Sequence, residues 1–504
     1  MTESANGQRR MVNRLRLRTL EPAVGERHAS WFELFFDLVF VFAVSQVAHV
    51  LSVQTDLMGL LKYLALFAAV WWSWVGFTYY ADRFETDEAA YRVTMFAAML
   101  AVIGLSLAVG NAFSPEGDVS FVVCYGLVVL LLVLLYVRAA YYVPLARGFS
   151  LQFITGLGGA VGLLLLSLLL APPFRYLIWA AAFLLELATP FLNIRLARAI
   201  PIDRSHIPER FGLFTIIVLG EAVIVTANSA ASVEWNLTTV TTACIGFAMA
   251  ACIWWINFDF VEDAALRSPA LLRRLVYLYG HFFIVSSIVA IGVGVEHAIK
   301  ESVEPHLHLP TLALLSIGIA VYFGATMIVR LIVGVCNLFY VRIAAIASLL
   351  TVPLVGGFLP PLVVVAGLFA ILAGAVWLET QYGNERLVHE SPVLVSCEHE
   401  GEMQIFRPRR ENACEECRKN NYKWVHLRLC LSCGHVGCCD TSVNKHATKH
   451  FHKSGHPIMA SLETGEQWAW CYADDRFVPL EKHVERLPEN APEDPGGNME
   501  VSNA

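Results

Sequence analysis

Long apolar stretches separated by short turns fill most of the chain from Trp31 to Glu379. A helix needs about 20 mainly apolar residues to cross the hydrocarbon core of a bilayer. Stretches of this kind lie near residues 31–51, 58–80, 91–112, 119–142, 149–171, 174–194, 210–230, 237–260, 275–298, 311–333, 339–358 and 361–379. Proline pairs at 172–173 and 360–361 mark two of the breaks between them. The pattern predicts an all-α polytopic membrane bundle of about twelve transmembrane helices.

The composition agrees with a membrane protein. Only 16% of the residues are charged, against 56% apolar residues and a mean hydropathy of +0.56. A soluble domain of this size would carry about a quarter charged residues. The first apolar stretch follows six arginines and lacks a small-residue cleavage site, so we expect a membrane helix there and not a cleaved signal peptide. With a net charge of −7 and no basic face, the chain is not expected to bind nucleic acid.

The distribution of arginine and lysine predicts the orientation of the spans, because cytoplasmic segments carry an excess of both residues. When the N-terminus is placed inside, that side receives the N-terminal arginines and most later ones, among them Arg83, Arg138, Arg210, Arg330 and Arg342. The opposite side receives little beyond Lys62, Arg175 and Lys300. We therefore expect a multipass protein of the inner (plasma) membrane with both termini in the cytoplasm.

An internal repeat relates the first six spans to the last six. The matching segments are Phe32–Phe35 with Phe211–Phe214, Trp71-Trp72 with Trp254-Trp255, and Val137-Arg138 with Val329-Arg330. Chance similarity among apolar helices is the alternative explanation. The pattern predicts two parallel six-helix repeats, near residues 28–200 and 201–382, related by an axis along the membrane normal.

Ionisable residues inside the spans are the functional candidates of the membrane part, since a charge at mid-bilayer costs roughly 3 kcal/mol. Glu33 and Asp37 share one face of the first span near its cytoplasmic end, where the helix dipole alone would also stabilise them. Glu186 and Glu221 lie deeper, and we expect them to be close together; structural bonds between helices are the alternative. His281 completes the predicted polar site, with Asn257, Asp259, Glu296 and His297 as further members. The tryptophans Trp71, Trp72, Trp74, Trp254 and Trp255 fit an interfacial belt at least as well as a ligand site.

Two segments resemble signatures of the bacterial low-temperature-requirement A family. The first runs from His28 to Phe42 and contains Phe-Glu-Leu-Phe-Phe-Asp, and the second runs from His206 to Glu221. The resemblance covers about residues 28–380 and implies a multipass inner-membrane protein, without naming a biochemical activity. A weaker similarity links Phe35-Phe36-Asp37 to the Phe-Ser-Asp triplet of potassium channels with two six-helix repeats, although the serine is missing here.

Eight of the twelve cysteines fall between Cys397 and Cys471, interleaved with seven histidines. Such density indicates either disulfides in an oxidising compartment or metal in a reducing one. Two Cys-x-x-Cys hooks, at 414–417 and 430–433, have the spacing that grips one side of a tetrahedral zinc ion. Since an even number of spans places this module in the cytoplasm, we expect zinc. The other four cysteines, Cys124, Cys244, Cys252 and Cys336, are expected to be small buried hydrophobes.

The whole of residues 397–478 resembles the ubiquitin-protease-type zinc finger, a small α/β module. The resemblance implies two or three zinc sites. Their ligands would be Cys414, Cys417, Cys438 and His446; Cys430, Cys433, His450 and His456; and Cys397, His399, Cys471 and Asp474. In the third site Asp474 stands where the family has a cysteine. Spacing alone does not separate Cys438 from Cys439 as the ligand.

Ubiquitin-binding members of that family hold the free C-terminal carboxylate with aromatic residues and an arginine. The matching aromatic residues are Trp424, Trp470 and Tyr472, but Asp440 replaces the arginine. A carboxylate would repel the ligand carboxylate, so we do not expect ubiquitin binding to be inherited. The finger is expected to bind another cytosolic protein or peptide C-terminus, or to sense one.

These observations divide the chain and leave three classes of function. We expect a basic tail at 1–27, the membrane domain at 28–382, a linker at 383–394, the finger at 395–480 and a disordered tail at 481–504. A transporter or channel-like protein using buried carboxylates is the leading hypothesis. A membrane-anchored sensor or scaffold without transport activity is the alternative. An intramembrane enzyme is not expected, because no catalytic constellation is present.

Overall fold

The computed structural model divides the chain into two compact units, residues 1–382 and 383–504. It describes residues 15, 29–84, 88–114, 117–192, 206–260, 271–333, 339–382, 399–404, 408, 413–420, 422–439, 442–462, 468–474 and 476–478.

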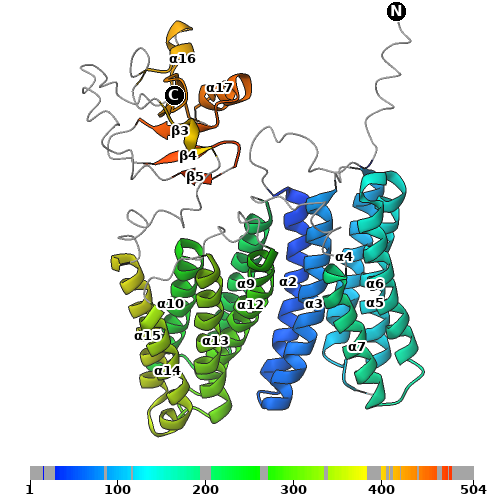
Figure 1. The fold of residues 1–504 in the computed structure, drawn as a ribbon. Coiled ribbons are helices and arrows are strands. Elements are labelled where there is room, and N and C mark those ends of the chain that lie inside the picture. The colour runs from blue at the N-terminus through cyan, green and yellow to red at the C-terminus, as the bar shows by residue number, and fades with distance from the viewer. Residues whose placement is uncertain are drawn as a thin grey trace, which may run out of the picture. The chain divides into compact units, whose positions relative to one another are not determined.

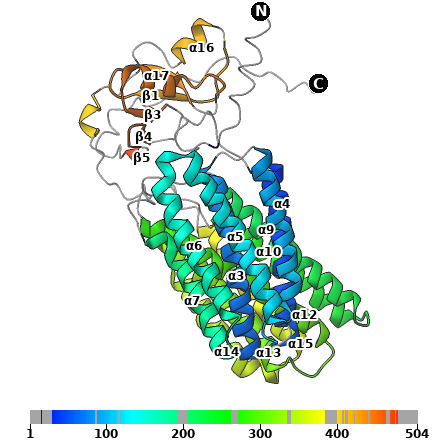
Figure 2. The same ribbon diagram turned by 90° about the vertical axis from the view of Figure 1, so that its right-hand side faces the viewer.

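The first unit is a bundle of long helices (Figures 1 and 2). Its first half contains α2 (Trp31–Val53), α3 (Leu57–Arg83), α4 (Ala89–Val109), α5 (Asp118–Tyr142), α6 (Arg147–Ser167) and α7 (Phe174–Ala188). The second half contains α9 (His206–Ala231), α10 (Leu237–Phe260), α12 (Leu271–Lys300), α13 (Leu309–Val333), α14 (Phe339–Val355) and α15 (Pro361–Tyr382). Among the described residues, 12 helices are long and apolar enough to cross a membrane. The predicted fold class is confirmed.

The two halves pack their helices in a corresponding order. In the first half α2 packs on α3 and α4, and α4, α5 and α6 follow one another. In the second half α9 packs on α10 and α12, and α12, α13 and α14 follow one another. The halves differ at their ends, since α7 packs on α6 whereas α15 packs mainly on α10. Contacts between the halves join α2 and α3 to α9 and α12, which places these four helices at the centre of the bundle.

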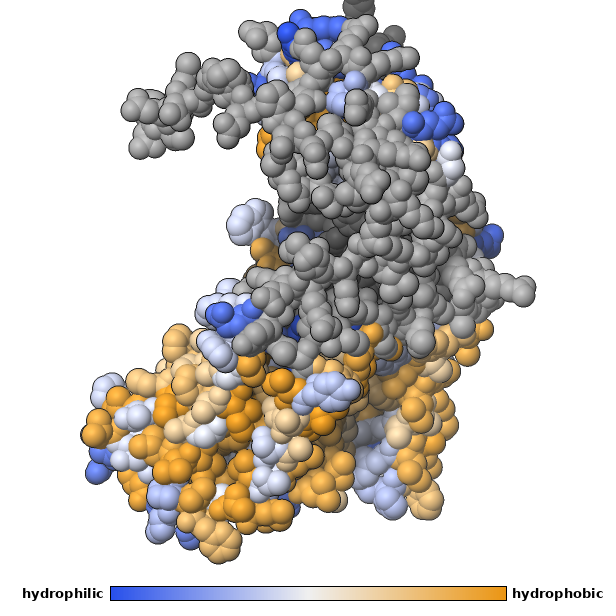
Figure 3. Space-filling model, turned by 60° about the vertical axis from the view of Figure 1, so that its left-hand side comes forward, coloured by the Kyte–Doolittle hydropathy of each residue, from blue (hydrophilic) through white to orange (hydrophobic). Residues whose placement is uncertain are grey.

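The outer surface of the bundle is predominantly apolar (Figure 3). Large apolar side chains such as Leu100, Leu107 and Leu134 are exposed at regular helical intervals, as lipid contact requires. Local sequence fixes the helix starts: Ser30 and Glu33 form a reciprocal capping box at α2, and Asp56 accepts a hydrogen bond from the Gly59 amide at α3. The surface of the bundle is therefore suited to contact with a lipid bilayer.

The tryptophans of the first half do not form an interfacial belt, and that interpretation is wrong for them. Trp71, Trp72 and Trp74 are 1%, 9% and 0% exposed. Trp74 packs on Phe214 of α9, with ring centroids 4.4 Å apart. Their counterparts in the second half, Trp254 and Trp255, are 47% and 44% exposed and fit the expected belt. The difference arises because α3 faces α9 across the centre of the bundle, whereas α10 does not lie between the halves.

The second unit is a small α/β domain. Its elements are α16 (Glu415–Lys419), β1 (Leu427–Cys430), β2 (Val436–Cys438), α17 (His446–Ser454), β3 (Ile458–Ser461), β4 (Ala469–Cys471) and β5 (Arg476–Val478). The strands form one antiparallel sheet in the order β2-β1-β3-β4-β5, with Leu429 opposite both Val436 and Ala460. Its apolar core is small and includes Leu429, Val436, Ile458 and Val478. So small a core needs additional stabilisation, and the cysteines and histidines lie around it.

Candidate metal centres and a buried polar column

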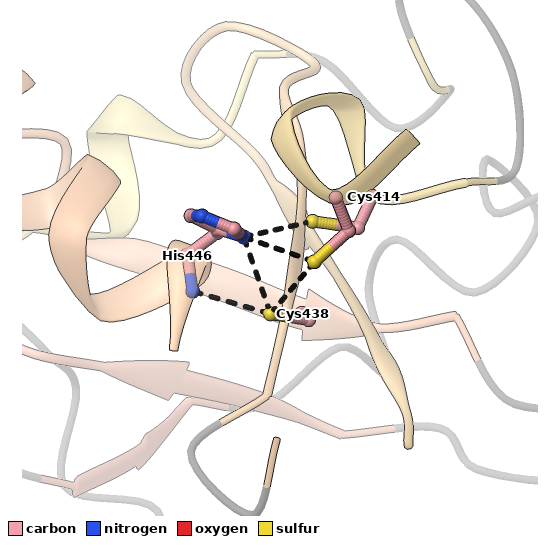
Figure 4. Close-up of side chains that lie close together, drawn as sticks. Cys414, Cys438 and His446 are labelled. Carbon is pink, nitrogen blue, oxygen red and sulfur yellow. Dashed lines mark hydrogen bonds between the residues drawn. The ribbon is translucent and has the colours of Figure 1, made fainter. Parts of the chain in front are cut away.

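The first metal cluster joins α16, β2 and α17. The His446 Nδ1 atom lies 3.2 Å from the sulfur atoms of Cys414 and Cys417 and 3.4 Å from that of Cys438 (Figure 4). The sulfurs of Cys417 and Cys438 are 3.8 Å apart. Zinc–sulfur bonds of about 2.3 Å in a tetrahedron place two sulfurs about 3.8 Å apart. The geometry fits a closed Cys₃His zinc site.

Local structure explains how these four ligands meet. Cys414 is the N-cap of α16, so one turn of helix carries Cys417 back to its side. A side chain at Gly437 would lie 2.6 Å from the Ala447 backbone nitrogen, so glycine lets β2 approach α17 closely. The structure also decides between the adjacent cysteines: the Cys439 sulfur lies 3.4 Å from the Ser442 hydroxyl and outside the cluster.

The second metal cluster is built on the turn between β1 and β2 and on the end of α17. Cys430 ends β1, and Gly434, with φ of +76°, allows the tight turn that returns Cys433 to its side. The Cys433 sulfur lies 3.3 Å from His450 Nε2, and that nitrogen lies 3.3 Å from His456 Nδ1. The Cys430 sulfur lies 3.6 Å from His456 Nδ1. This set fits a Cys₂His₂ zinc site.

The protonation of these ligands also suits a metal. Burial raises the pKa of the Cys414 and Cys430 thiols to about 12. A bound zinc ion reverses this effect, since it holds the thiolate form. Burial, followed by the charges of His435 and His456, lowers the pKa of His450 to about 4. His450 is therefore neutral at physiological pH and has a lone pair for a metal.

His435 connects the two clusters, and the sequence pattern did not single it out. Its ring stacks on His450 with centroids 4.1 Å apart, and its Nε2 atom lies 2.8 Å from Glu416 Oε1. Burial opposes ionisation of Glu416, but the hydrogen bond and charge of His435 outweigh it and lower the pKa of this carboxyl. Glu416 lies between the first pair of cysteines, so the pair ties the first hook to a ligand of the second site.

The third cluster has three described ligands, whereas the other two have four each. His399 Nδ1 lies 3.1 Å from Asp474 Oδ2 and 3.7 Å from the Cys471 sulfur. The predicted fourth ligand, Cys397, lies outside the described residues. Asp474 occupies the place expected for it, because a turn after β4 brings its amide 3.4 Å from the Cys471 sulfur. In each of the three clusters the ligand atoms lie within 4.8 Å of one another.

The three aromatic residues predicted for a peptide pocket belong to different surroundings. Trp424 is 38% exposed and precedes β1. Tyr472 stacks on Phe451 of α17, and Trp470 lies within β4 opposite Met459. Among the residues that the structure describes, no ring contact joins Trp424 to either of them. Asp440, which replaces the family arginine, lies outside the described residues.

In the membrane unit, Glu33 and Asp37 form ion pairs across the junction of the two halves. Arg210, in the first turns of α9, places its Nη1 atom 3.2 Å from Glu33 and its Nη2 atom 2.5 Å from Asp37. Trp74 donates a hydrogen bond of 2.7 Å to the same oxygen of Asp37. The other Asp37 oxygen, Oδ2, is buried without a hydrogen-bond partner among the described residues. Arg210 is 1% exposed, so it is buried at the beginning of α9 and does not lie in an exposed loop.

A second ring of contacts extends this cluster to α3. His206 Nε2 lies 3.4 Å from Glu33, and its Nδ1 atom lies 3.0 Å from Asp82 at the end of α3. All these side chains are buried. Among the described residues, three carboxylates thus contact one guanidinium and one imidazole. The helix-dipole explanation of Glu33 and Asp37 accounts for only part of this arrangement, because it lacks their cationic partners.

Further polar contacts continue along α2 toward its other end. Ser45 donates a hydrogen bond of 2.6 Å to Glu221 of α9, and His297 of α12 lies 3.0 Å from the Ser52 carbonyl oxygen. From Glu33 to Ser52 the helix rises about 28 Å, close to the thickness of the hydrocarbon core. We call these contacts, from Glu33 through Glu221 to His297, the polar column. It follows α2 along its contact with the second half.

Glu186 does not belong to the polar column. It lies on α7 and accepts a hydrogen bond of 2.8 Å from Tyr125 of α5. Since α7 packs on α6 and α9 packs on α2, α3, α10 and α12, the structure does not bring Glu186 and Glu221 together. The expectation that they lie close to each other is wrong. Its cause is that α7 turns to the outside of the first half, which sequence spacing does not reveal.

The remaining predicted polar residues occupy separate places. His281 of α12 packs on Phe211, next to Arg210, and its Nδ1 atom lies 2.7 Å from the Tyr277 carbonyl oxygen. Asn257 is buried, and Glu296 pairs with Lys300 at 2.6 Å. The side chain of Asp259 is not among those described.

A buried ion-pair cluster in the second half was missed by the sequence analysis. Glu379 near the end of α15 binds Arg330 at 2.8 Å and Arg342 at 2.6 Å. Arg342 also donates a hydrogen bond of 2.7 Å to Thr326. The charge distribution gave both arginines a side of the membrane but no partner, and an acidic residue at the C-terminal end of an apolar stretch was the available signal. The cluster fixes the end of α15 to α13 and α14.

Comparison with known proteins agrees with the description of both the membrane unit and the finger. The family described as Bacterial low temperature requirement A protein matches residues 28–377, and the family described as Zn-finger in ubiquitin-hydrolases and other protein matches residues 414–483. Both resemblances drawn from the residues are confirmed. The first match covers more than half of the chain, and the second assigns the clustered cysteines and histidines to a zinc finger.

Individual relatives resemble either a long part of the chain or a short segment of the length of the finger. The uncharacterized protein RA0937 of Rhizobium meliloti is 31% identical over 291 residues, 53% of this chain and 68% of the relative. Ubiquitin carboxyl-terminal hydrolase 44 of Ailuropoda melanoleuca is 34% identical over 88 residues, and the human BRCA1-associated protein is 38% identical over 75 residues. These matches span only 11% and 12% of the two relatives. A solution structure of protein RPA1320 from Rhodopseudomonas palustris is 44% identical, covers 20% of this chain and 95% of the other, and has a TM-score of 0.18.

Proposed function

This chain belongs to the bacterial low temperature requirement A family, and from its polar column we propose that it is a transporter or channel-like membrane protein for protons or small cations. The observation that carries the proposal is the column along α2. It combines acidic and imidazole groups at the junction of the two halves over about the thickness of a bilayer. Ionisable groups inside membrane spans usually mark ion or proton pathways.

The chemistry of the column suits a cation better than an anion. Where α2, α3 and α9 meet, the column holds three carboxylates, Glu33, Asp37 and Asp82, in contact with Arg210 or His206. The Asp37 oxygen that has no hydrogen-bond partner among the described residues would accept a proton or a small cation. Glu221, which accepts a hydrogen bond from Ser45, provides the next carboxylate along α2. His297 then gives an imidazole near the other end.

The proposed function is tested with the full chain in sealed liposomes. Dyes that respond to protons, potassium, sodium or chloride are trapped inside, and a gradient of the matching ion is imposed each time. We expect a protein-dependent flux for at least one cation and none for chloride. Vesicles that leak no faster than protein-free vesicles under every gradient would favour the alternative, a membrane-anchored sensor or scaffold without transport activity.

For the C-terminal finger we propose three zinc ions, one in each cluster. The first two clusters supply four protein ligands each, and Cys397 would complete the third. Closed sites of this kind stabilise a fold and leave no open coordination position for a reaction. The finger would therefore be a binding or sensing element, and the chain would not be an enzyme.

The side of the membrane is part of the proposal. The bias of arginine toward one set of loops places both termini in the cytoplasm, in the inner membrane of a bacterium. There the finger would meet a cytosolic protein or peptide C-terminus. Reporter fusions at the two termini test this orientation: activity only of a reporter that works in the cytoplasm is expected at both ends. A C-terminal reporter active outside would overturn it.

A further inference from the structure

One face of the zinc finger carries exposed apolar and basic side chains together. Tyr422, Trp424, Val425 and Val443 are 53%, 38%, 58% and 94% exposed. Lys423 and Lys445, their neighbours in sequence, are exposed as well. We call these six residues the docking face. Large apolar side chains gathered on so small a domain indicate a surface that is covered in use.

The docking face consists of two segments that the first metal cluster holds side by side. The Val425 amide donates a hydrogen bond of 2.9 Å to Ser442, and the Tyr422 amide donates one of 2.8 Å to the Cys417 carbonyl oxygen. Asn444 places its amide nitrogen 3.9 Å from the Cys417 sulfur. Each segment is therefore attached next to a zinc ligand. The face is formed before any partner arrives, which lowers the entropy cost of binding.

The charge around the docking face is strongly positive. Residues 417–462 contain seven lysines and arginines and a single acidic residue, Asp440, in a chain whose net charge is −7. The two carboxylates that directly precede this stretch in the sequence have partners of their own: Glu416 binds His435, and Glu415 lies 3.4 Å from the Val436 amide. The surface that covers this face should therefore be apolar beneath and negatively charged at its rim.

The chain itself keeps the finger near such a surface. Glu379 is bound by Arg330 and Arg342, so the end of α15 is fixed in the membrane unit. Residues 383–398 separate this helix from the first described residue of the finger. At full extension they span about 55 Å. A tether of this length gives the finger a high effective concentration at the bilayer surface.

We propose that the docking face binds the anionic phospholipid surface of the membrane that carries the chain. Tryptophan and tyrosine favour the headgroup level of a bilayer, because their rings are apolar with a polar edge. Each lysine close to an anionic leaflet strengthens binding about fivefold. The occupant is thus lipid, and the proposal does not depend on transport by the bundle.

Photo-cross-linking of the full chain tests this inference. The amino acid p-benzoyl-phenylalanine is placed at Val443, the most exposed member of the docking face, and the zinc-loaded protein is reconstituted in nanodiscs. One set contains phosphatidylcholine alone, and the other contains phosphatidylcholine with phosphatidylglycerol. After illumination, intact-mass analysis shows what the probe has captured. We expect a phospholipid adduct, and much more of it with phosphatidylglycerol present.

Charge variants test whether membrane binding depends on the lysines of the docking face or on general electrostatic attraction of the finger to the membrane. The double variant Lys423→Gln and Lys445→Gln removes two positive charges and should weaken docking about thirtyfold. The matched control is Lys453→Gln, two turns further along α17, which should change the adduct yield little. Zinc content is measured for each variant and must equal that of the parent, which shows that the finger is folded.

Three outcomes would overturn the proposal. The first is a cross-link to the chain's own membrane unit in place of lipid, and the second is no adduct at all. The third is equal adduct yield in the two lipid compositions. If a cytosolic extract is added and the probe then captures a protein in place of lipid, the docking face is a protein-binding surface and not a membrane-binding one.

Discussion

The finger and the membrane unit bury polar side chains by different means. In the finger, thiols and imidazoles that would be costly in an apolar core converge on sites that fit zinc. In the bundle, carboxylates at the junction of the halves are matched by guanidinium and imidazole groups from another helix. The first arrangement depends on an ion from outside the chain, whereas the second pairs side chains of the chain with one another. Stability should therefore respond to metal in one unit and to single charge removals in the other.

Removal of zinc should give the largest difference in stability between the two units. Structural zinc contributes about 10–16 kcal/mol of apparent folding free energy in small fingers, which the small core of this one cannot replace. We expect a chelator to make residues 399–478 of the full chain sensitive to protease while the helical circular dichroism of the bundle persists. A zinc-free chain whose finger still resists protease would contradict the account.

The substitution Arg210→Met should destabilise the bundle by about 3–5 kcal/mol, because it leaves Glu33 and Asp37 buried without their main cation. The measurement is thermal unfolding of the full chain in detergent. The matched control is Lys300→Met, which breaks the partly exposed pair with Glu296 and should cost less than about 1 kcal/mol. Equal effects of the two substitutions would mean that the buried cluster has no special role.

Within the finger, the third site should be the first to fail. Asp474→Ala should reduce bound zinc from three ions to two, since the first and second clusters keep all four ligands. Asp474→Cys supplies a thiolate and should keep all three. Elemental analysis of the purified chain gives the ratio. Loss of every ion in the alanine variant would show that the three sites are not independent.

A substitution in the Glu416–His435 pair, which links the first two clusters, should have a smaller effect on zinc binding. Glu416→Gln removes the charge that faces His435, which stacks on the zinc ligand His450. Groups that support a metal ligand from outside usually change metal affinity by about 10–100-fold. Competition with a chelator measures the affinity of the second site. Unchanged affinity would make the Glu416–His435 pair irrelevant to metal binding.

We expect the smallest effect in the loop before α13, where His308 contributes slightly to the pH dependence of stability. His308 lies 3.1 Å from Glu301, and its hydrogen bond and charge interaction with Glu301 raise the pKa of this imidazole. The folded-state pKa lies above the unfolded one, so this contribution is fully present below about pH 6.5 and is lost as the pH rises through the folded-state pKa. His308→Gln should remove the slight pH dependence, which thermal unfolding at a series of pH values measures. The side chain is more than half exposed, so a large change would be unexpected.

The sequence predicted the site of the finger better than the partners in the bundle, and the reason is physical. Ligands such as Cys414, Cys417, His446 and His450 lie at short spacings that local turns and one helix largely determine, so their grouping follows from the sequence alone. Partners in the bundle are set by long-range packing: Arg210 lies 173 positions from Asp37 in the chain. Spacing placed Glu33 and Asp37 on one face but gave neither their partners nor the separation of Glu186 from Glu221.

The most direct test of the account compares two carboxylates of the same bundle. Glu221→Gln and Glu186→Gln each preserve shape and hydrogen bonding, but only Glu221 lies on the polar column. Both variants are reconstituted in sealed liposomes at equal protein content, and cation flux is measured with the trapped dyes. The account predicts that Glu221→Gln abolishes the flux of the parent and that Glu186→Gln retains it. Normal flux through the Glu221→Gln variant would contradict the assignment of the polar column as the pathway.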